Sequence, residues 1–199
     1  TGPSGRSALM SGDIDYYTTI AFMVQSAVVG LPVKVVAAYV NCPPFILMSR
    51  PELKSAQDLK GKTVGVGAPP GSSPDVIAKL SLKHLGLDAD KDVKYVYLNS
   101  HERTYLALEQ GLYAAGLIPP PFDFKGAKLG LNSLARAAEF LTYPEDGLIA
   151  TVKKIKEKPD EVRRVIRAGI KANRYIRSQR EGTVQFLMAW QKVDRETAS

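Results

Sequence analysis

Short apolar runs alternate along this chain with segments that carry helix start and stop signals. The runs at 32–40 (PVKVVAAYV), 44–48 (PFILM) and 63–66 (TVGV) have the length and β-branched content of buried strands. A helical pattern over about 19–29 stops at Gly30, a residue that commonly ends helices. Strands that alternate with helices build an α/β fold, so we expect an α/β protein with largely parallel sheets.

Prolines and glycines predict further boundaries. After the strand at 63–66, Ser73 can cap a helix, Pro74 suits its first position and Asp75 complements its dipole. A longer amphipathic helix begins at Pro159. The three consecutive prolines 119–121 cannot continue a strand, and they fit an ordered crossover between two lobes.

Length and charge limit the classes of function. The 199 residues suffice for one domain or two small lobes, and no run approaches the roughly 18 to 20 apolar residues of a membrane-spanning helix. The formal net charge is +7, with much of the excess after residue 150. That region carries an apolar stripe and no aromatic stacking platform, which favours a solvated helix face over a nucleic-acid partner.

Cysteine and histidine are scarce. His84 and His101 are the two histidines, and His101 opens a predicted helix, where we expect it to cap the helix or to be hydrated. Cys42 is the single cysteine and stands in no metal-ligand spacing, so we expect neither a metal nor another cofactor. The loop at 65–73 (GVGAPPGSS) lacks the lysine of a phosphate-binding Walker loop, and its third glycine comes one place late for a dinucleotide motif. The GxSxG nucleophile pattern is absent. We therefore expect no catalytic residues.

A non-covalent ligand site is the remaining interpretation of this loop. Gly71, Ser72 and Ser73 stand at a predicted helix N-terminus, where backbone N–H groups and hydroxyls can hold an anion or a polar ring edge. In the alternative interpretation, Ser73 merely caps its own helix and Gly71 merely permits the turn. The local pattern leaves both open.

Several segments in a fixed order carry a resemblance to a known family. The strongest are SGDID at 11–15 and DLKGKTVGV at 58–66, followed by KDVKYVYL at 91–98 and KPDEVRRVIRAG at 158–169. In these segments the chain resembles the solute-binding proteins of ABC importers, and more narrowly the nitrate/sulfonate/taurine and thiamine-pyrimidine-precursor group. The resemblance covers nearly the whole chain and says little about the ligand.

The resemblance implies a type II periplasmic-binding-protein fold, with two α/β lobes and a ligand cleft between them. Residues 1–54 and 121–199 would form one discontinuous lobe, and residues 55–120 the other. By position in the family, ligand-binding residues would come from the loop after SGDID, the loop after DLKGKTVGV and the proline-rich segment. They are Tyr16, Tyr17, Thr18, Thr19, Gly71, Ser72, Ser73, Pro121 and Phe122.

The implied function is capture of a small ligand, anionic or heteroaromatic, for delivery to an ABC permease from a periplasmic or extracellular membrane-associated position. SGDID stands unusually early for this family, and residues 1–7 show no signal peptide, so we expect a fragment or a trimmed chain. A missing first strand would leave an open sheet edge, through which we expect a homodimer to form.

Two other classes share the fold. Enzymes of thiamine-pyrimidine or menaquinone biosynthesis form the first. The former use a histidine and a cysteine-rich motif that this chain lacks, whereas the latter are not excluded by any motif. Effector-binding sensor domains form the second, and they would need an attached DNA-binding or signalling module. A turnover assay without added cofactor separates an enzyme from a binder.

Overall fold

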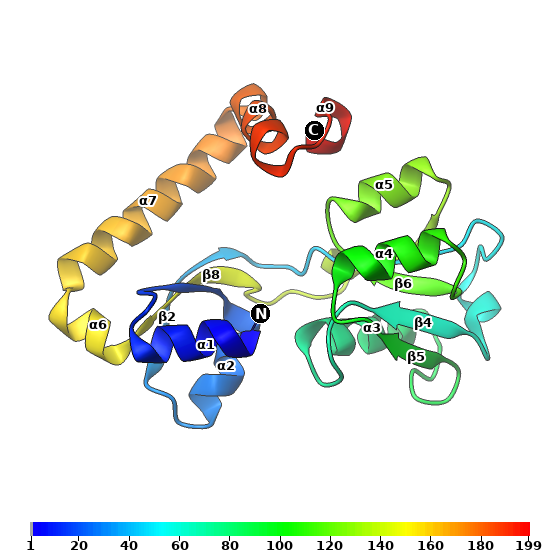
Figure 1. The fold of residues 1–199 in the computed structure, drawn as a ribbon, viewed down its shortest axis with the longest axis horizontal. Coiled ribbons are helices and arrows are strands. Elements are labelled where there is room, and N and C mark those ends of the chain that lie inside the picture. Colours follow the sequence, from blue (N-terminus) through cyan, green and yellow to red (C-terminus); the bar gives the residue numbers. More distant parts are fainter. Residues whose placement is uncertain (1) are drawn as a thin grey trace. The chain divides into compact units, whose positions relative to one another are not determined.

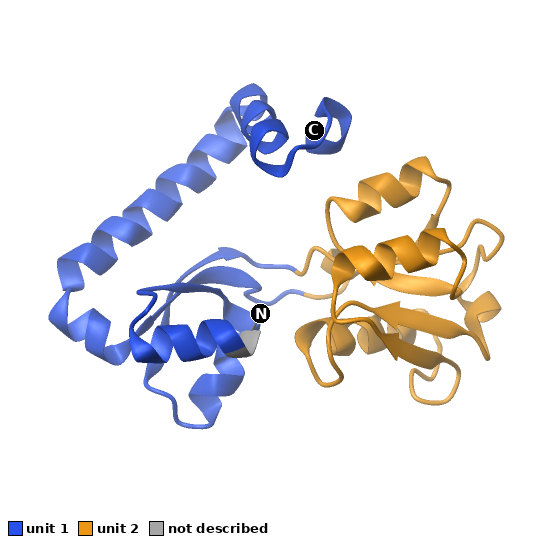
Figure 2. Cartoon of the chain, viewed as in Figure 1, with its two compact units in different colours: residues 1–42, 142–199 blue, residues 43–141 orange. Residues whose placement is uncertain are grey.

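A computed structural model describes residues 2–199 of the chain (Figure 1). The chain divides into two compact units (Figure 2). Unit 1 comprises residues 1–42 and 142–199, and unit 2 comprises residues 43–141. The chain therefore passes between the units twice, at 42/43 and at 141/142.

Unit 1 contains a three-stranded sheet with the order β1-β8-β2. Its strands are β1 (Tyr17–Thr19), β2 (Val33–Val40) and β8 (Asp146–Thr151), and both pairings are antiparallel. Its helices are α1 (Gly2–Ser11), α2 (Ile20–Val28), α6 (Val152–Glu157), α7 (Pro159–Ser178), α8 (Arg180–Gln191) and α9 (Arg195–Ala198). In the described chain β1 and β2 are the sheet's edges, and the expected homodimer through such an edge stays a prediction.

The core of unit 1 lies between its sheet and its first two helices. Its buried members come from α1, α2, β2 and β8: Leu9, Ile20, Met23, Val33 and Ile149. On β2, the Tyr39 hydroxyl donates to the Ile166 carbonyl at 3.5 Å, which ties α7 to the sheet. The second half of α7 extends beyond this contact, and its apolar residues Ile170 and Ile176 are exposed.

Unit 2 contains a five-stranded sheet with the order β5-β4-β6-β3-β7. Its strands are β3 (Ile46–Ser49), β4 (Thr63–Val66), β5 (Lys94–Tyr97), β6 (Ala115–Ile118) and β7 (Asn132–Arg136). Its helices are α3 (Ser73–His84), α4 (His101–Glu109) and α5 (Phe122–Lys128), with short 3₁₀ turns η1 (Ala56–Leu59) and η2 (Ala137–Glu139). Leu47, Leu59, Val64, Leu82 and Leu117 are fully or almost fully buried here.

Strand direction differs in part from the sequence prediction. Strand β4 is parallel to β5 and to β6, as expected of a β-α-β unit. Strand β3 is antiparallel to β6 and to β7, and every pairing in unit 1 is antiparallel. The prediction of largely parallel sheets was wrong, because an apolar run reports that a strand is buried and does not report its direction.

The proline-rich segment and the unit boundaries also differ from expectation. Residues 119–121 join β6 to α5 inside unit 2, so they are not a crossover between units; the Pro120–Pro121 peptide is cis. The expected boundaries at 54/55 and 120/121 both lie within unit 2. The reason is strand pairing: β3 lies between β6 and β7, which draws residues 43–54 and 121–141 into the same sheet.

A helix that crosses a lipid bilayer must be both long and apolar. Across residues 2–199, no helix combines the two properties to the degree that crossing a membrane needs. The longest helix, α7, has twenty residues and carries many arginine and lysine side chains.

Candidate functional site

The predicted ligand residues of unit 2 lie at one edge of its sheet. The carboxyl ends of β4, β5 and β6 meet there because β4 is parallel to both neighbours. Ile46 lies opposite both Ile118 and Arg136, so the start of β3 and the end of β7 share this edge. Since the chain enters the unit before Ile46 and leaves it after Arg136, we refer to this as the crossing edge of unit 2.

The turn between β4 and α3 uses its own hydrogen-bond donors. Gly71 has a positive φ of 77°, and its N–H donates to Asp75 Oδ2 at 2.8 Å. The N–H and the hydroxyl of Ser72 both donate to the Pro69 carbonyl, at 3.2 and 2.6 Å. Ser72, not Ser73, is the N-cap residue, and Ser73 is the first residue of α3. The donors of Gly71 and Ser72 are therefore already engaged within the turn.

Asp75 holds this turn against the neighbouring strand. Its side chain is almost fully buried, and its Oδ1 accepts a hydrogen bond from the Tyr97 hydroxyl at 2.8 Å. Burial, and then this hydrogen bond, raise the pKa of Tyr97 to about 12. The sequence pattern marked Asp75 only as a complement to the helix dipole, because nothing in it shows that the carboxylate reaches back to Gly71 and across to β5.

Pro121 and Phe122 follow β6 at the same edge. Pro121 is the N-cap of α5 and Phe122 its first residue. The Phe122 ring stacks on Tyr105 of α4, with centroids 5.4 Å apart, and Lys125 Nζ lies 5.6 Å from its centroid. Phe122 is half-buried, so its ring serves the packing of α5 on α4 while it borders the edge.

His101 also lies at this edge, although the sequence pattern indicated only a capping or hydrated residue at the start of a helix. Its ring contacts Phe45, with centroids 5.5 Å apart, and it packs directly against Gly67 in the loop after β4. Among the described residues its buried Nδ1 has no hydrogen-bond partner. Burial lowers the pKa of His101. Arg103, two residues further on, is exposed.

Unit 1 has a corresponding crossing edge. Thr19 at the end of β1 and Val40 at the end of β2 both lie opposite Asp146 at the start of β8. The chain leaves the unit after residue 42 and returns at residue 142, beside these strand ends. Thr19 is half-buried at this edge as the N-cap of α2, and Thr18 is exposed.

Tyr16 lies before β1, at the end of the strand away from the crossing edge. Its hydroxyl donates to Glu161 Oε1 at 3.3 Å, and Lys154 Nζ lies 5.8 Å from its ring centroid. The same ammonium pairs with Asp15 at 2.8 Å and with Glu161 at 2.7 Å. Burial, followed by the charge of Glu161, raises the pKa of Tyr16. Tyr16 thus packs against α6 and α7.

Tyr17 faces the core of unit 1. Its ring lies 6.5 Å from that of Phe22 and rests on Gly5 of α1, where no side chain intervenes. Both tyrosine rings are therefore engaged in packing within unit 1.

Two acidic residues at the crossing edge of unit 1 were not anticipated. Glu145 is 7% exposed, its carbonyl accepts the Ile20 N–H at 2.9 Å, and its Oε2 has no partner among the described residues. Burial raises the pKa of Glu145 and also that of its neighbour Asp146. The segment YPEDG gave no signal of this, because charged residues before a strand usually face solvent.

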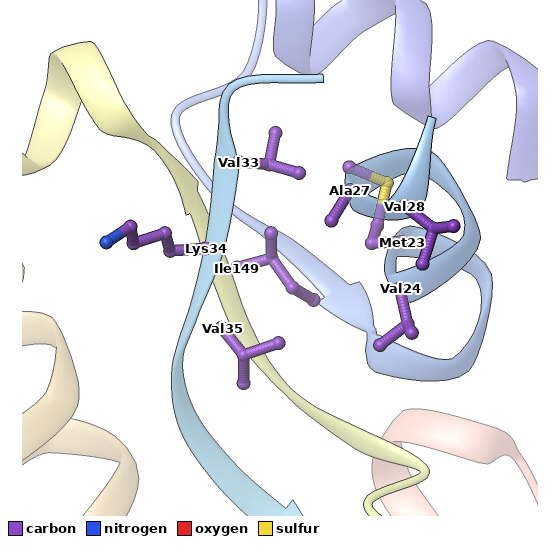
Figure 3. Close-up of a pocket in the computed structure, with 8 residues that line it drawn as sticks. All are labelled: Met23, Val24, Ala27, Val28, Val33, Lys34, Val35 and Ile149. Carbon is purple, nitrogen blue, oxygen red and sulfur yellow. The ribbon is translucent and has the colours of Figure 1, made fainter. Parts of the chain in front are cut away.

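A separate apolar groove of about 300 Å³ lies between α2 and the strands β2 and β8 (Figure 3). The side chains that gather in it are Met23, Val24, Ala27, Val28, Val33, Val35 and Ile149, and Lys34 points to the other side of its strand. None of the predicted ligand residues lines the groove. No polar side chain labelled in Figure 3 points into it to orient a small ligand.

The structure thus groups the predicted residues by edge. Gly71, Ser72, Ser73, Pro121 and Phe122 come together at the crossing edge of unit 2, and Thr18 and Thr19 reach that of unit 1. Their roles as ligand contacts stay predictions. Across residues 2–199, no three His, Cys, Asp or Glu side chains are arranged to hold a metal ion.

This chain is similar in sequence to one protein family and to relatives described as binding proteins. The family model described as NMT1/THI5 like matches residues 8–181. Relatives described as binding proteins in Brucella abortus and Brucella suis are each 30% identical to this chain over 146 residues. That match covers 71% of this chain and 44% of each relative, so the chain spans less than half the length of the curated relatives it matches.

Solved structures give the same fold. The periplasmic aliphatic sulphonate binding protein SsuA of Escherichia coli superposes with a TM-score of 0.79 at 20% identity, over 99% of this chain and 68% of that one. The alkanesulfonate-binding protein SsuA of Xanthomonas axonopodis pv. citri, bound to MOPS, gives 0.81 at 20% identity, over 100% and 68%. This chain therefore has the two-unit α/β fold of periplasmic binding proteins.

Proposed function

The chain belongs to the NMT1/THI5-like family, and from that premise we propose that it is the solute-binding component of an ABC importer. It captures a small ligand between its two units and delivers it to a permease. It works in the periplasm or on the outer side of the cytoplasmic membrane, and it acts as a binder, not as an enzyme.

One observation carries this proposal. All the predicted ligand residues of unit 2, and two of the four in unit 1, lie at the edge where the chain crosses to the other unit. In unit 2 these are Gly71–Ser73 and Pro121–Phe122, and in unit 1 they are Thr18 and Thr19. In open α/β sheets, ligands bind beyond the carboxyl ends of parallel strands, and pockets occur preferentially between domains. The rings of Tyr16 and Tyr17 are instead engaged in packing within unit 1.

The ligand class we propose is small and either anionic or heteroaromatic. The net charge of +7 favours association with anions, and the two structural relatives named above bind sulfonates according to their names. The carboxyls of Glu145, which is buried, and Asp146, which is half-buried, add a second feature. Protonated, a carboxyl can donate a hydrogen bond to an anion; ionised, it can accept one from the N–H of a heterocycle.

A thermal-shift screen tests the proposal. The panel contains ethanesulfonate, nitrate, bicarbonate, an aminopyrimidine and benzoate, each measured at pH 5.5 and pH 8. A ligand that binds only the native state raises the melting temperature, by an amount that grows with the logarithm of its excess over Kd. An anion held by a protonated carboxyl gives the larger shift at pH 5.5, and a heterocycle that donates to a carboxylate gives it at pH 8.

Mass spectrometry of the incubated panel separates a binder from an enzyme. Unchanged compounds accompanied by a melting shift support the importer component. A converted compound would instead favour an enzyme of the same fold. Absence of any shift would contradict the ligand classes proposed.

A further inference from the structure

His101 stands out among the buried polar groups of unit 2. Its Nδ1 is covered by the protein and has no hydrogen-bond partner among the described residues. Buried nitrogen atoms are nearly always hydrogen-bonded, because an unpaired one has lost water and gained nothing in return. An imidazole kept in such a place at the edge of a sheet requires an explanation beyond packing.

The surroundings hold the ring in a fixed position. It lies against the backbone of Gly67, where a Cβ would collide with the ring and with the backbone of His101. The buried ring of Phe45 supports it from the start of β3, with centroids 5.5 Å apart. Ser100 accepts the Arg103 N–H at 3.3 Å and so fixes the first turn of α4. The ring is therefore preorganised at the crossing edge.

The buried position of Nδ1 selects one tautomer. A neutral imidazole carries a proton on one nitrogen and a lone pair on the other. Leaving an N–H without a partner is rarer in proteins than leaving an acceptor under-satisfied. The proton therefore belongs on Nε2, which is not among the buried unpartnered atoms, and the lone pair faces Gly67.

We propose that His101 is a ligand-contacting residue of unit 2 and that its Nε2–H donates a hydrogen bond to an acceptor oxygen of the ligand, such as a sulfonate, carboxylate or carbonyl oxygen. This inference rests on the proposed function, since it adds a donor to the same site. It also supplies a donor that Gly71 and Ser72 do not offer, because their N–H groups and the Ser72 hydroxyl are engaged within the β4–α3 turn.

Imidazole ¹⁵N NMR of the whole chain tests the tautomer without any ligand. The chain has only two histidines, so the His101→Phe variant assigns both spin systems. We expect the Nε2–H tautomer for His101 at pH 7.5. A proton on Nδ1 would overturn the inference, whether or not a ligand is known, and would leave the proposed function untouched.

Ethanesulfonate and benzoate are the probes for the contact itself. A probe that raises the melting temperature must also shift the Nε2 signal of His101. The signal of His84 should stay unchanged, because His84 stacks on Phe140 at the far end of α3. A melting shift with a silent His101 overturns the inference alone. If neither probe raises the melting temperature, the acceptor-oxygen ligand class fails for the proposed function and for His101 together.

Variants of His101 distinguish a ligand contact from a role in packing alone. His101→Phe keeps an aromatic ring against Phe45 and removes both nitrogens, so we expect about ten-fold weaker binding of the active probe with an unchanged or higher melting temperature. His101→Gln restores a donor and recovers part of the affinity. His84→Phe is the matched control and leaves affinity unchanged. Equal affinity in wild type and His101→Phe would contradict the contact.

Discussion

Two loops that the sequence predicted as ligand walls are held in place by different forces. The β4–α3 turn of unit 2 is fixed by one buried carboxylate, Asp75, which accepts from Gly71 N–H and from the Tyr97 hydroxyl. The segment before β1 in unit 1 is fixed by Lys154, which pairs with Asp15 and Glu161 near the protein surface. The Asp75 side chain is 4% exposed, whereas the Asp15 side chain is 59% exposed.

The difference decides how each loop responds to its surroundings. Buried hydrogen bonds lie in a low dielectric and are hardly screened, so the β4–α3 turn depends on the presence of Asp75 and little on salt. Surface ion pairs contribute little, and salt weakens them. A rigid turn on a sheet edge is what a ligand wall needs, and this favours unit 2 as the more rigid half of the proposed site.

The largest expected effect is that of Asp75→Ala. The change leaves Gly71 N–H and the Tyr97 hydroxyl without their shared acceptor, and hydrogen bonds to charged groups are each worth about 1.5–3 kcal/mol. We expect the free energy of unfolding to fall by about 3 kcal/mol, measured by urea titration. Asp90→Ala is the control, because Asp90 is exposed and pairs with Lys79, whose ammonium also lies 4.0 Å from Asp75 Oδ2. Equal losses for the two variants would remove the distinction between the loops.

A second expected effect tests the close approach of α4 to the turn. Gly67→Ala places a Cβ against the backbone of His101, which we expect to cost about 2 kcal/mol and to displace the imidazole. Gly71→Ala meets open space, and its cost of about 1 kcal/mol comes from its positive φ alone. Thermal unfolding of both variants, followed by circular dichroism, shows which one loses more stability. A larger loss of stability in Gly71→Ala than in Gly67→Ala would contradict the prediction.

The two loops also differ in how much of their structure the sequence could predict. Strand β4 was predicted correctly and the start of α3 to within one residue, because a short apolar run, a proline and an acidic first turn are local signals. The same local logic gave the helix stop near Gly30. Asp75 was assigned to its helix only, since its two partners are fixed by the fold of the turn and by the neighbouring strand.

Long-range contacts account for the other positions that the sequence did not predict. Tyr16 and Glu161 are 145 positions apart in sequence, and no periodicity connects them. The buried position of Glu145 follows from the pairing of β8 with two strands, β1 and β2, which no local pattern encodes. His101 looked like a cap because its role depends on Gly67 and Phe45, both far from it in the chain.

Glu145→Gln tests the effect of the buried Glu145 carboxyl on stability. We expect this variant to stabilise the protein. Because burial raises the folded-state pKa of Glu145, the native state favours the protonated form, and stability is lost as pH rises through that pKa. The variant removes this loss, so we expect it to be more stable than wild type at pH 8, by about 1 kcal/mol. The gain disappears below about pH 4.3, the usual pKa of an unfolded glutamate. Urea titrations at pH 4 and pH 8 measure it.

The smallest expected effect is that of Lys154→Met. Its dependence on pH and salt shows whether the effect comes from the ion pairs of Lys154. Hydrogen bonds to Asp15 and Glu161 raise the pKa of Lys154, and the hydrogen bond from Lys154 lowers the pKa of Glu161. The contribution of Lys154 is therefore present between about pH 4.3 and pH 10.4, the two unfolded-state values. It is lost as pH falls through the pKa of Glu161 or rises through that of Lys154. At pH 7 we expect a melting temperature lower by at most about 2 °C.

High salt then distinguishes the forces that hold the two loops in place. In 0.5 M NaCl the difference between Lys154→Met and wild type should shrink toward zero, while the loss in Asp75→Ala persists. Lys153→Met is the matched control, since the Lys153 side chain is exposed and its loss should be silent at either salt concentration. A salt-independent effect of Lys154→Met would mean that its stem and the Tyr16 ring beneath it stabilise unit 1 by packing. The segment before β1 would then be as rigid as the turn that Asp75 holds.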